Sequence, residues 1–137
     1  MIFKKYIRYC LLFLMTANPF FCKAADLQYF KPAGISGVLS EIEGVDCCLN
    51  GKEKKALFPV IILSSPVNFV PQNPSKPEID EMIEVGVNVI QLALDDKLLK
   101  SFTILKGNRA RVLCKPFHAT NGHHIMPVLC NVESISK

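Results

Sequence analysis

The sequence lacks several features on which common functions depend. It has no tryptophan, only three tyrosines and no glycine-rich phosphate loop. Proteins that bind single-stranded nucleic acid stack bases on aromatic side chains in a basic groove, and phosphate loops need glycines so that backbone amides can approach the phosphates. No two cysteines have the Cys-x2-Cys spacing of structural zinc sites. These absences argue against a nucleic-acid-binding protein, a nucleotide-binding enzyme and a four-cysteine zinc protein.

The first residues instead have the three-part pattern of a secretory leader. A basic start with Lys4, Lys5 and Arg8 precedes a mostly apolar stretch over 10–21. Small residues then stand at the positions that signal peptidase reads, three and one residues before the bond to be cut. A cut after Ala24 fits this pattern, with Cys22 at the other small position. We therefore expect residues 1–24 to be a signal peptide and residues 25–137 to form a single domain.

Two other roles fit this leader less well. A retained membrane anchor needs about 20 apolar residues, whereas this stretch is shorter and contains Asn18 and Pro19. A lipoprotein would carry small residues directly before its cysteine, but Phe20 and Phe21 precede Cys22. Cleavage fits best and anchoring comes second, so we expect a periplasmic or secreted protein with no membrane span after cleavage.

Removal of the leader changes the apparent charge and cysteine content. The whole chain has 16 Lys and Arg against 12 Asp and Glu, and the leader contains four basic residues and no acidic one. Residues 25–137 are therefore neutral overall, which removes the electrostatic argument for a nucleic-acid partner. Four cysteines remain, Cys47, Cys48, Cys114 and Cys130. In an oxidising compartment they can form up to two disulfides, in three connectivities, although buried free cysteines are an alternative.

The rest of the chain is dominated by strand patterns. Apolar and β-branched residues predict strands over 35–42, 56–63 and 82–94, the last with a bulge near Val89 and Ile90. Residues 44–55 and 64–80 are rich in polar residues or proline, which indicates two long loops. Asp95 or Asp96 is placed to cap a short helix that carries Leu98, Leu99 and Phe102. Alternating residues predict two further strands, over 109–120 and 124–135. Five strands with a small helix between the third and fourth predict a mainly β, OB-like Greek-key barrel; another small β-sandwich or open barrel is the alternative.

The last two strands form a predicted hairpin around Asn121 and Gly122. A two-residue loop would place the apolar residues of the two strands on opposite faces, because a shift of one residue inverts every side chain. We therefore expect a three-residue loop, Thr120 to Gly122, that brings both apolar sets to the core. In that register His118 lies opposite His124. Cys114 and Cys130 then share a face on a diagonal, where a direct disulfide is possible but strained.

The same hairpin resembles a known family. Phe117, Gly122, His123, His124, Pro127, Val128 and Leu129 fit the signature of the exported bacterial family called domain of unknown function 4431. That signature usually reads Thr-Gly-His-His-His-Thr, and here Asn121, Ile125 and Met126 stand where Thr, His and Thr are usual. The segments 37–39, 63–67 and 89–92 are similar to the family's first three strands. The resemblance implies a fold and a compartment but no activity.

The histidines offer the clearest chemistry in the sequence. His118, His123 and His124 all lie on the hairpin, and imidazoles are ligands for zinc or copper. Two facing imidazoles form an incomplete ligand set, since such sites usually need three or four groups. With Asn121 and Gly122 the histidines form the candidate binding residues. No serine or cysteine stands in a context that predicts a catalytic nucleophile, so no enzyme activity is expected.

A binding function therefore remains. A small neutral barrel with long loops presents variable surface on a rigid frame, and fold alone does not name the partner. We expect an exported binding module for an envelope protein or a cell-wall component, such as an inhibitor or an immunity protein. The alternative is a small metal-binding envelope protein that uses the histidines.

Overall fold

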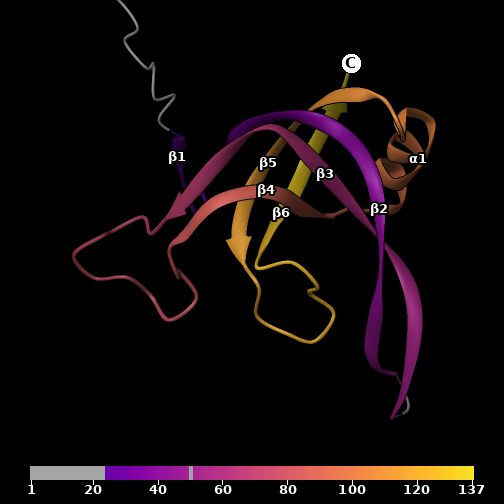
Figure 1. Ribbon diagram of the computed structural model, residues 1–137, viewed down its shortest axis with the longest axis horizontal. Coiled ribbons are helices and arrows are strands. Elements are labelled where there is room, and N and C mark those ends of the chain that lie inside the picture. Colours follow the sequence, from indigo (N-terminus) through magenta and orange to yellow (C-terminus); the bar gives the residue numbers. More distant parts are fainter. Residues whose placement is uncertain (1–23, 50) are drawn as a thin grey trace, which may run out of the picture.

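The structure is a computed structural model that describes residues 24–49 and 51–137 (Figure 1). The expected leader, apart from Ala24, lies outside the described residues. Within the described part, no helix combines the length and the apolar character needed to cross a membrane.

Six strands and one helix make up the described chain. In order they are β1 (Ala25–Gln28), β2 (Ala33–Leu49), β3 (Lys52–Val70), β4 (Glu84–Ala93), α1 (Asp96–Leu105), β5 (Arg109–His118) and β6 (Val128–Ser136). The strands pair in the order β1-β3-β2-β5-β6-β4, and β4 pairs back onto β3. Strands β2 to β6 thus close a five-stranded barrel, which confirms the predicted OB-like architecture.

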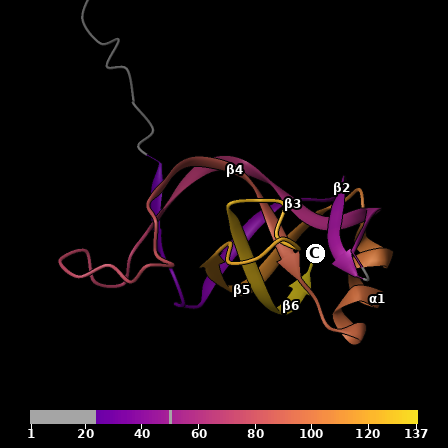
Figure 2. The ribbon, with the colours of Figure 1, turned by 90° about the horizontal axis from the view of Figure 1, so that it is seen from below.

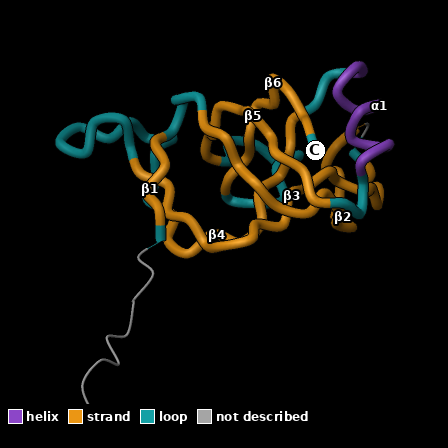
Figure 3. The backbone as a smooth tube through the Cα atoms, turned by 90° about the horizontal axis from the view of Figure 1, so that it is seen from above, coloured by secondary structure: helices purple, strands orange, loops and turns teal. Residues whose placement is uncertain are grey.

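The helix lies where the sequence predicts it, between the third and fourth barrel strands. Asp95 is its N-cap, and its Oδ1 accepts a hydrogen bond from the backbone N–H of Leu98 at 2.7 Å. Phe102 is buried in the main core. Figures 2 and 3 show the helix at one end of the molecule and the long β3–β4 connection at the other.

The predicted loop over 44–55 is wrong. Residues 33–49 and 52–70 instead form one long antiparallel hairpin, whose regular pairing continues outward to Asp46 and Lys54 and whose last pair, after a register shift, is Leu49 with Lys52. The far half projects from the barrel as a two-stranded ribbon (Figure 1). A ribbon can be solvated on both faces, so its polar and charged sequence does not conflict with strand pairing. Lys55 and Glu43 make an ion pair of 2.9 Å on it.

The predicted loop over 64–80 is also too long. Strand β3 continues to Val70, and the connection to β4 spans 71–83. The four-residue strand β1, absent from the prediction, pairs in parallel with 67–70. The bulge near Val89 and Ile90 was predicted wrongly, because both residues pair in regular register with β3. One irregularity lies on β3 between Ile62 and Val67, where Pro66 has no N–H to donate to a partner strand. A second lies between the pairs Val67–Val87 and Phe69–Glu84 and gives β4 one extra residue.

The core confirms which side chains of the last two strands were predicted to point inward. Ala110, Val112 and Cys114 of β5 are buried together with Val128 and Cys130 of β6. Cys114 and Cys130 form a disulfide with their Cα atoms 5.6 Å apart, a normal separation for this bond. The side chains of Cys47 and Cys48 lie outside the described residues.

Candidate functional site at two anchored loops

The connection between β5 and β6 is longer than predicted. His118 pairs with Val128, so the loop spans 119–127 and the predicted three-residue turn is wrong. His118 consequently does not lie opposite His124 in the ladder. Over Cys114 to His118 the observed register differs from the predicted one by four residues, an even number, so these side chains keep their predicted faces. A register shift between Leu113 and Cys114 changes the pairing beyond that point.

Hydrogen bonds within the loop fix its shape. Its ends are joined by the N–H of Ala119, which donates to the carbonyl of Pro127 at 2.9 Å. The side-chain oxygen of Asn121 accepts from the N–H of His123 at 2.9 Å, and its carbonyl accepts from the N–H of His124 at 3.1 Å. Asn121 therefore makes a side-chain-assisted turn, with Gly122 exposed inside it.

A buried glutamine on β4 anchors this loop to the barrel. Gln91 is 6% exposed. Its Oε1 accepts from the N–H groups of Ile125 at 2.8 Å and Met126 at 3.3 Å, and its Nε2 donates to the carbonyl of His123 at 3.2 Å. Each hydrogen-bonding atom of the buried amide thus has a loop partner, as a buried polar group requires. Sequence reasoning missed Gln91, since it lies inside an apolar strand pattern.

His123 connects the loop to the projecting ribbon. Its Nδ1 makes a hydrogen bond with Oδ1 of Asp46 on β2. The methyl-bearing side chain of Ile125 also packs close to Gly44, where an added Cβ would lie 2.9 Å from Cγ2 of Ile125. The ribbon and the loop are therefore held side by side, although 77 positions separate His123 from Asp46.

His124 is held in its neutral form. Its Nδ1 accepts a hydrogen bond from the N–H of Thr120 at 2.9 Å, and only an unprotonated nitrogen can accept. The ring lies edge-on to Phe117, with centroids 5.6 Å apart. Burial, and secondly the nearby His123, lower the pKa of His124 below its usual value.

His118 occupies a third environment, at the junction of two loops. Its Nδ1 faces the carbonyl of Ala119 at 3.1 Å, and its Nε2 lies 3.0 Å from Oε1 of Glu84 on β4. Both ring nitrogens therefore have an oxygen partner within hydrogen-bond distance. Tyr29 lies edge-on to this ring at 6.2 Å.

The three predicted metal ligands thus have three different sets of partners. His118 contacts Glu84, His123 contacts Asp46, and His124 contacts Thr120 and Phe117. Among residues 24–49 and 51–137, no group of three or more His, Cys, Asp or Glu is placed to hold a metal ion. The binding of zinc or copper by the histidines therefore stays a prediction, and this arrangement adds no support to it.

The second loop, between β3 and β4, is anchored at the same junction. Glu81 is 4% exposed, and its two carboxylate oxygens accept from the N–H groups of Gln72 at 3.2 Å and Glu78 at 3.1 Å. The hydroxyl of Tyr29 donates to the carbonyl of Met82 at 2.7 Å. Burial, then the charges of Glu84 and Glu81, raise the pKa of Tyr29, so its hydroxyl keeps the proton that it donates.

This anchored loop and the start of β4 present apolar side chains to solvent. Four large aliphatic residues form what we call the apolar ridge: Ile79, Met82, Ile83 and Val85. They are 94%, 60%, 63% and 77% exposed, respectively. The four stand within seven positions of the chain, and exposed large apolar side chains gathered in this way favour an interaction surface. The candidate functional site therefore combines the histidine loop and the apolar ridge, joined by Tyr29, His118 and Glu84.

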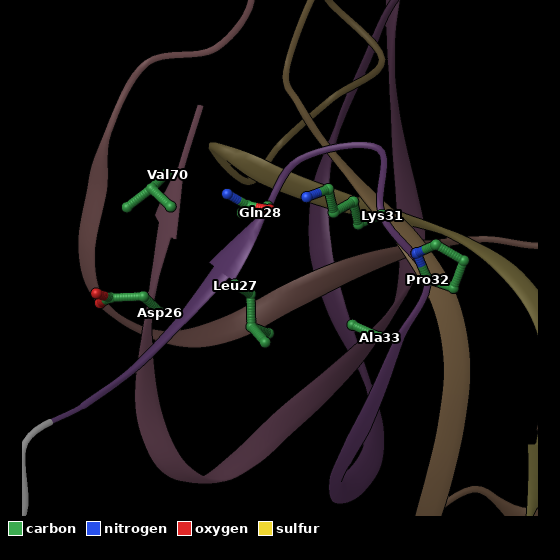
Figure 4. Close-up of a pocket in the computed structure, with 7 residues that line it drawn as sticks. All are labelled: Asp26, Leu27, Gln28, Lys31, Pro32, Ala33 and Val70. Carbon is green, nitrogen blue, oxygen red and sulfur yellow. The ribbon is translucent and has the colours of Figure 1, made fainter. Parts of the chain in front are cut away.

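A pocket of about 430 Å³ lies beside β1 (Figure 4). It is lined by Asp26, Leu27, Gln28, Lys31, Pro32, Ala33 and Val70. Figure 4 shows Asp26 and Lys31 on opposite sides of it, and Oδ1 of Asp26 accepts from Asn68 at 2.8 Å. None of the candidate residues predicted from the sequence lines this pocket.

The fold and these loops define the molecule as a small OB-like barrel with two anchored surface loops. Residues 89–136 match the family model described as a domain of unknown function, DUF4431. This match confirms the predicted resemblance over the end of β4, the helix, β5, the histidine loop and β6. The similar segments 37–39 and 63–67 lie outside it. No curated protein and no solved structure matches the chain.

Proposed function

We propose that the protein is an exported periplasmic or secreted binding module that engages another envelope protein through the β3–β4 loop. The apolar ridge is the observation that carries this proposal. Each aliphatic side chain that becomes buried in a partner contributes roughly 1.5–3 kcal/mol. Four such side chains on one short segment therefore provide several kcal/mol toward association, before the costs of binding are subtracted.

The anchoring of the loop supports the same function. A flexible loop must lose conformational entropy when it binds, whereas a loop already held in place does not. Glu81 holds the backbone before the ridge, at Gln72 and Glu78, and Tyr29 holds it within the ridge, at Met82. The ridge is thereby organised before it meets a partner, even though its side chains point into water.

The chemistry of the ridge favours a protein over a cell-wall glycan. Its side chains are aliphatic, so they complement an apolar pocket and offer no hydrogen bonds to sugar hydroxyls. The exposed acids Glu78 and Asp80 flank Ile79, so a basic rim on the partner would be complementary. An inhibitor or an immunity protein would use a surface of this kind. The leader pattern provides the argument for the compartment.

Capture of a partner by matched variants tests the proposal. The complete gene with a C-terminal affinity tag is expressed, and the protein is purified from the periplasmic fraction. The purified protein is then incubated with periplasmic extract, and captured proteins are identified by mass spectrometry. We expect at least one protein to be retained by the wild type and lost with Ile79→Asp and with Val85→Asp.

Ile104→Asp is the matched control, because Ile104 is 79% exposed but lies on helix α1, away from the ridge. It is expected to retain the same protein. The proposal is wrong if no protein is retained, or if all three variants capture the partner equally. The intact mass of the purified protein tests export separately, since cleavage after Ala24 leaves a chain that begins at Ala25.

A further inference from the structure

We propose that the outer face of β2, β3 and β5 holds a second binding site, which takes a phosphate group between Arg109 and Arg111. This site is distinct from the apolar ridge and does not depend on the function proposed for it. A pocket of about 500 Å³ lies on this face. It is lined by Ser36, Gly37, Ser64, Arg109, Ala110, Arg111 and Lys137.

Strand alternation places the two arginines on the same side of the barrel wall. Ala110 and Val112 point into the core, so Arg109 and Arg111 point outward. Arg111 pairs with Ser36 on β2 and with Ser136 on β6. Arg111 and its two cross-strand neighbours, Ser36 and Ser136, therefore all have side chains that can donate hydrogen bonds.

Neither guanidinium has an acidic partner in the described part of the chain. The ion pairs of residues 24–49 and 51–137 involve Lys55, Lys106, Lys115, His118 and His123. Lys115 is the informative contrast, since it stands on the same face of β5 and pairs with Glu133 at 3.3 Å. Two neighbouring arginines without an acidic side-chain partner place positive charge at the pocket.

The local structure holds both guanidinium groups in place. Nη2 of Arg109 donates to Oγ of Ser64 at 2.6 Å. Because Ser64 accepts this bond, its own hydroxyl proton remains to be donated to a ligand. Arg111 lies against β2 where Gly34 has no side chain, and a Cβ at Gly34 would come 2.6 Å from Nη2 of Arg111. The absence of that Cβ lets the guanidinium lie flat on the strand.

These donors suit a phosphate better than a carboxylate. Guanidinium groups bind oxyanions through paired, charge-assisted hydrogen bonds. A carboxylate has two oxygens and is satisfied by one arginine, whereas a phosphate offers more oxygens for two guanidinium groups and the hydroxyls of Ser36 and Ser64. The ligand expected here is therefore a phosphate group, either free or as the monoester of a larger envelope molecule.

Amide NMR of the purified, untagged protein tests the site with sodium phosphate, sodium acetate and sodium chloride at constant ionic strength and pH 7.5. We expect phosphate to shift the amide signals of Ser36, Gly37, Ser64 and Ala110 saturably, with millimolar or tighter affinity. Acetate should bind at least several-fold more weakly, and chloride should produce no saturable shift. Glycerol 1-phosphate and glucose 1-phosphate are then titrated in the same way. Tighter binding of glycerol 1-phosphate than of phosphate indicates a lipid-type monoester, and tighter binding of glucose 1-phosphate indicates a sugar-type monoester. Equal affinity of all three assigns the site to free phosphate.

Three variants connect binding to the arginines. Arg109→Gln and Arg111→Gln should each weaken phosphate binding by about tenfold or more, since each removes charge-assisted hydrogen bonds. Gly34→Ala should weaken it several-fold by displacing the guanidinium of Arg111, with the unfolding midpoint unchanged. Lys115→Gln is the control and should bind phosphate like the wild type. The proposal is overturned if acetate binds as tightly as phosphate, if the shifts do not saturate or map elsewhere, or if the arginine variants bind unchanged.

Discussion

His118, the last residue of β5, lies 3.0 Å through its Nε2 from Oε1 of Glu84, the first residue of β4. Both side chains are mostly buried. The adjacent Tyr29 lies edge-on to the ring of His118 and donates a hydrogen bond to the loop that precedes Glu84. The bases of the histidine loop and of the β3–β4 loop are thereby tied to one another. The relative position of the two loops depends on this pair.

Glu84→Gln should therefore destabilise the protein by roughly 1 kcal/mol, because it removes the charge from a partly buried hydrogen bond. Urea unfolding followed by circular dichroism measures the change. Glu133→Gln, which removes an exposed carboxylate from its pair with Lys115, is the matched control. It should change the free energy of unfolding by less than about 0.5 kcal/mol. Equal losses for both variants would contradict a special role for the His118–Glu84 pair.

The disulfide makes a larger contribution. Cys114 and Cys130 are 16 positions apart, and closing a loop of this size stabilises a protein by about 3 kcal/mol through the unfolded chain. The double variant Cys114→Ala, Cys130→Ala should lose at least that amount in urea unfolding. Alkylation under denaturing, non-reducing conditions provides the check on the bond itself. Mass spectrometry should find both cysteines unmodified, and alkylation of either would show that the bond is absent.

Much of the barrel could be predicted because its signals are local. Alternation over β5 identifies which of its residues face the core, and Asp95 marks the start of the helix one position before it. The same alternation predicted that Cys114 and Cys130 share a face, because only the parity of the register decides this, but it left the connectivity of the four cysteines open. Even a wrong loop length left Cys114 and Cys130 close, because the error was an even number of residues.

The site could not be predicted to the same extent because its contacts are not local. Asn121 and Gly122 favour a tight turn, but the loop opens to satisfy Gln91, which lies about thirty positions earlier on another strand. Asp46 and Glu84 also reach the histidines from distant strands. Strand β1 was missed for a related reason. Its four residues are too few to give a clear strand pattern, and it pairs with the part of β3 that follows Pro66, where the sequence predicted a loop.

Gln91 should control the order of the histidine loop. Gln91→Leu keeps the burial but removes three hydrogen bonds to the loop, each worth about 0.5–1.5 kcal/mol net. We expect a loss of about 2 kcal/mol in the free energy of unfolding and faster hydrogen exchange at the amides of Ile125 and Met126. Asn88→Leu, an exposed position on the same strand, is the control and should leave both amides protected. Unchanged exchange in the Gln91 variant would show that the loop is held by other contacts.

Acidification should loosen the same loop through His124. The pKa of His124 in the folded protein is lowered by burial, so the unfolded chain binds a proton more readily than the folded one. The contribution of the ring to stability is therefore fully present above its unfolded pKa of about 6.5. That contribution is lost as the pH falls through the lowered folded pKa, because a protonated Nδ1 no longer accepts from Thr120. The difference in unfolding free energy between wild type and His124→Gln should therefore shrink from pH 7.5 to pH 5. In parallel, NMR should place the titration midpoint of the His124 ring below 6.5; a midpoint above 6.5, or a difference that grows in acid, would contradict the neutral, accepting ring.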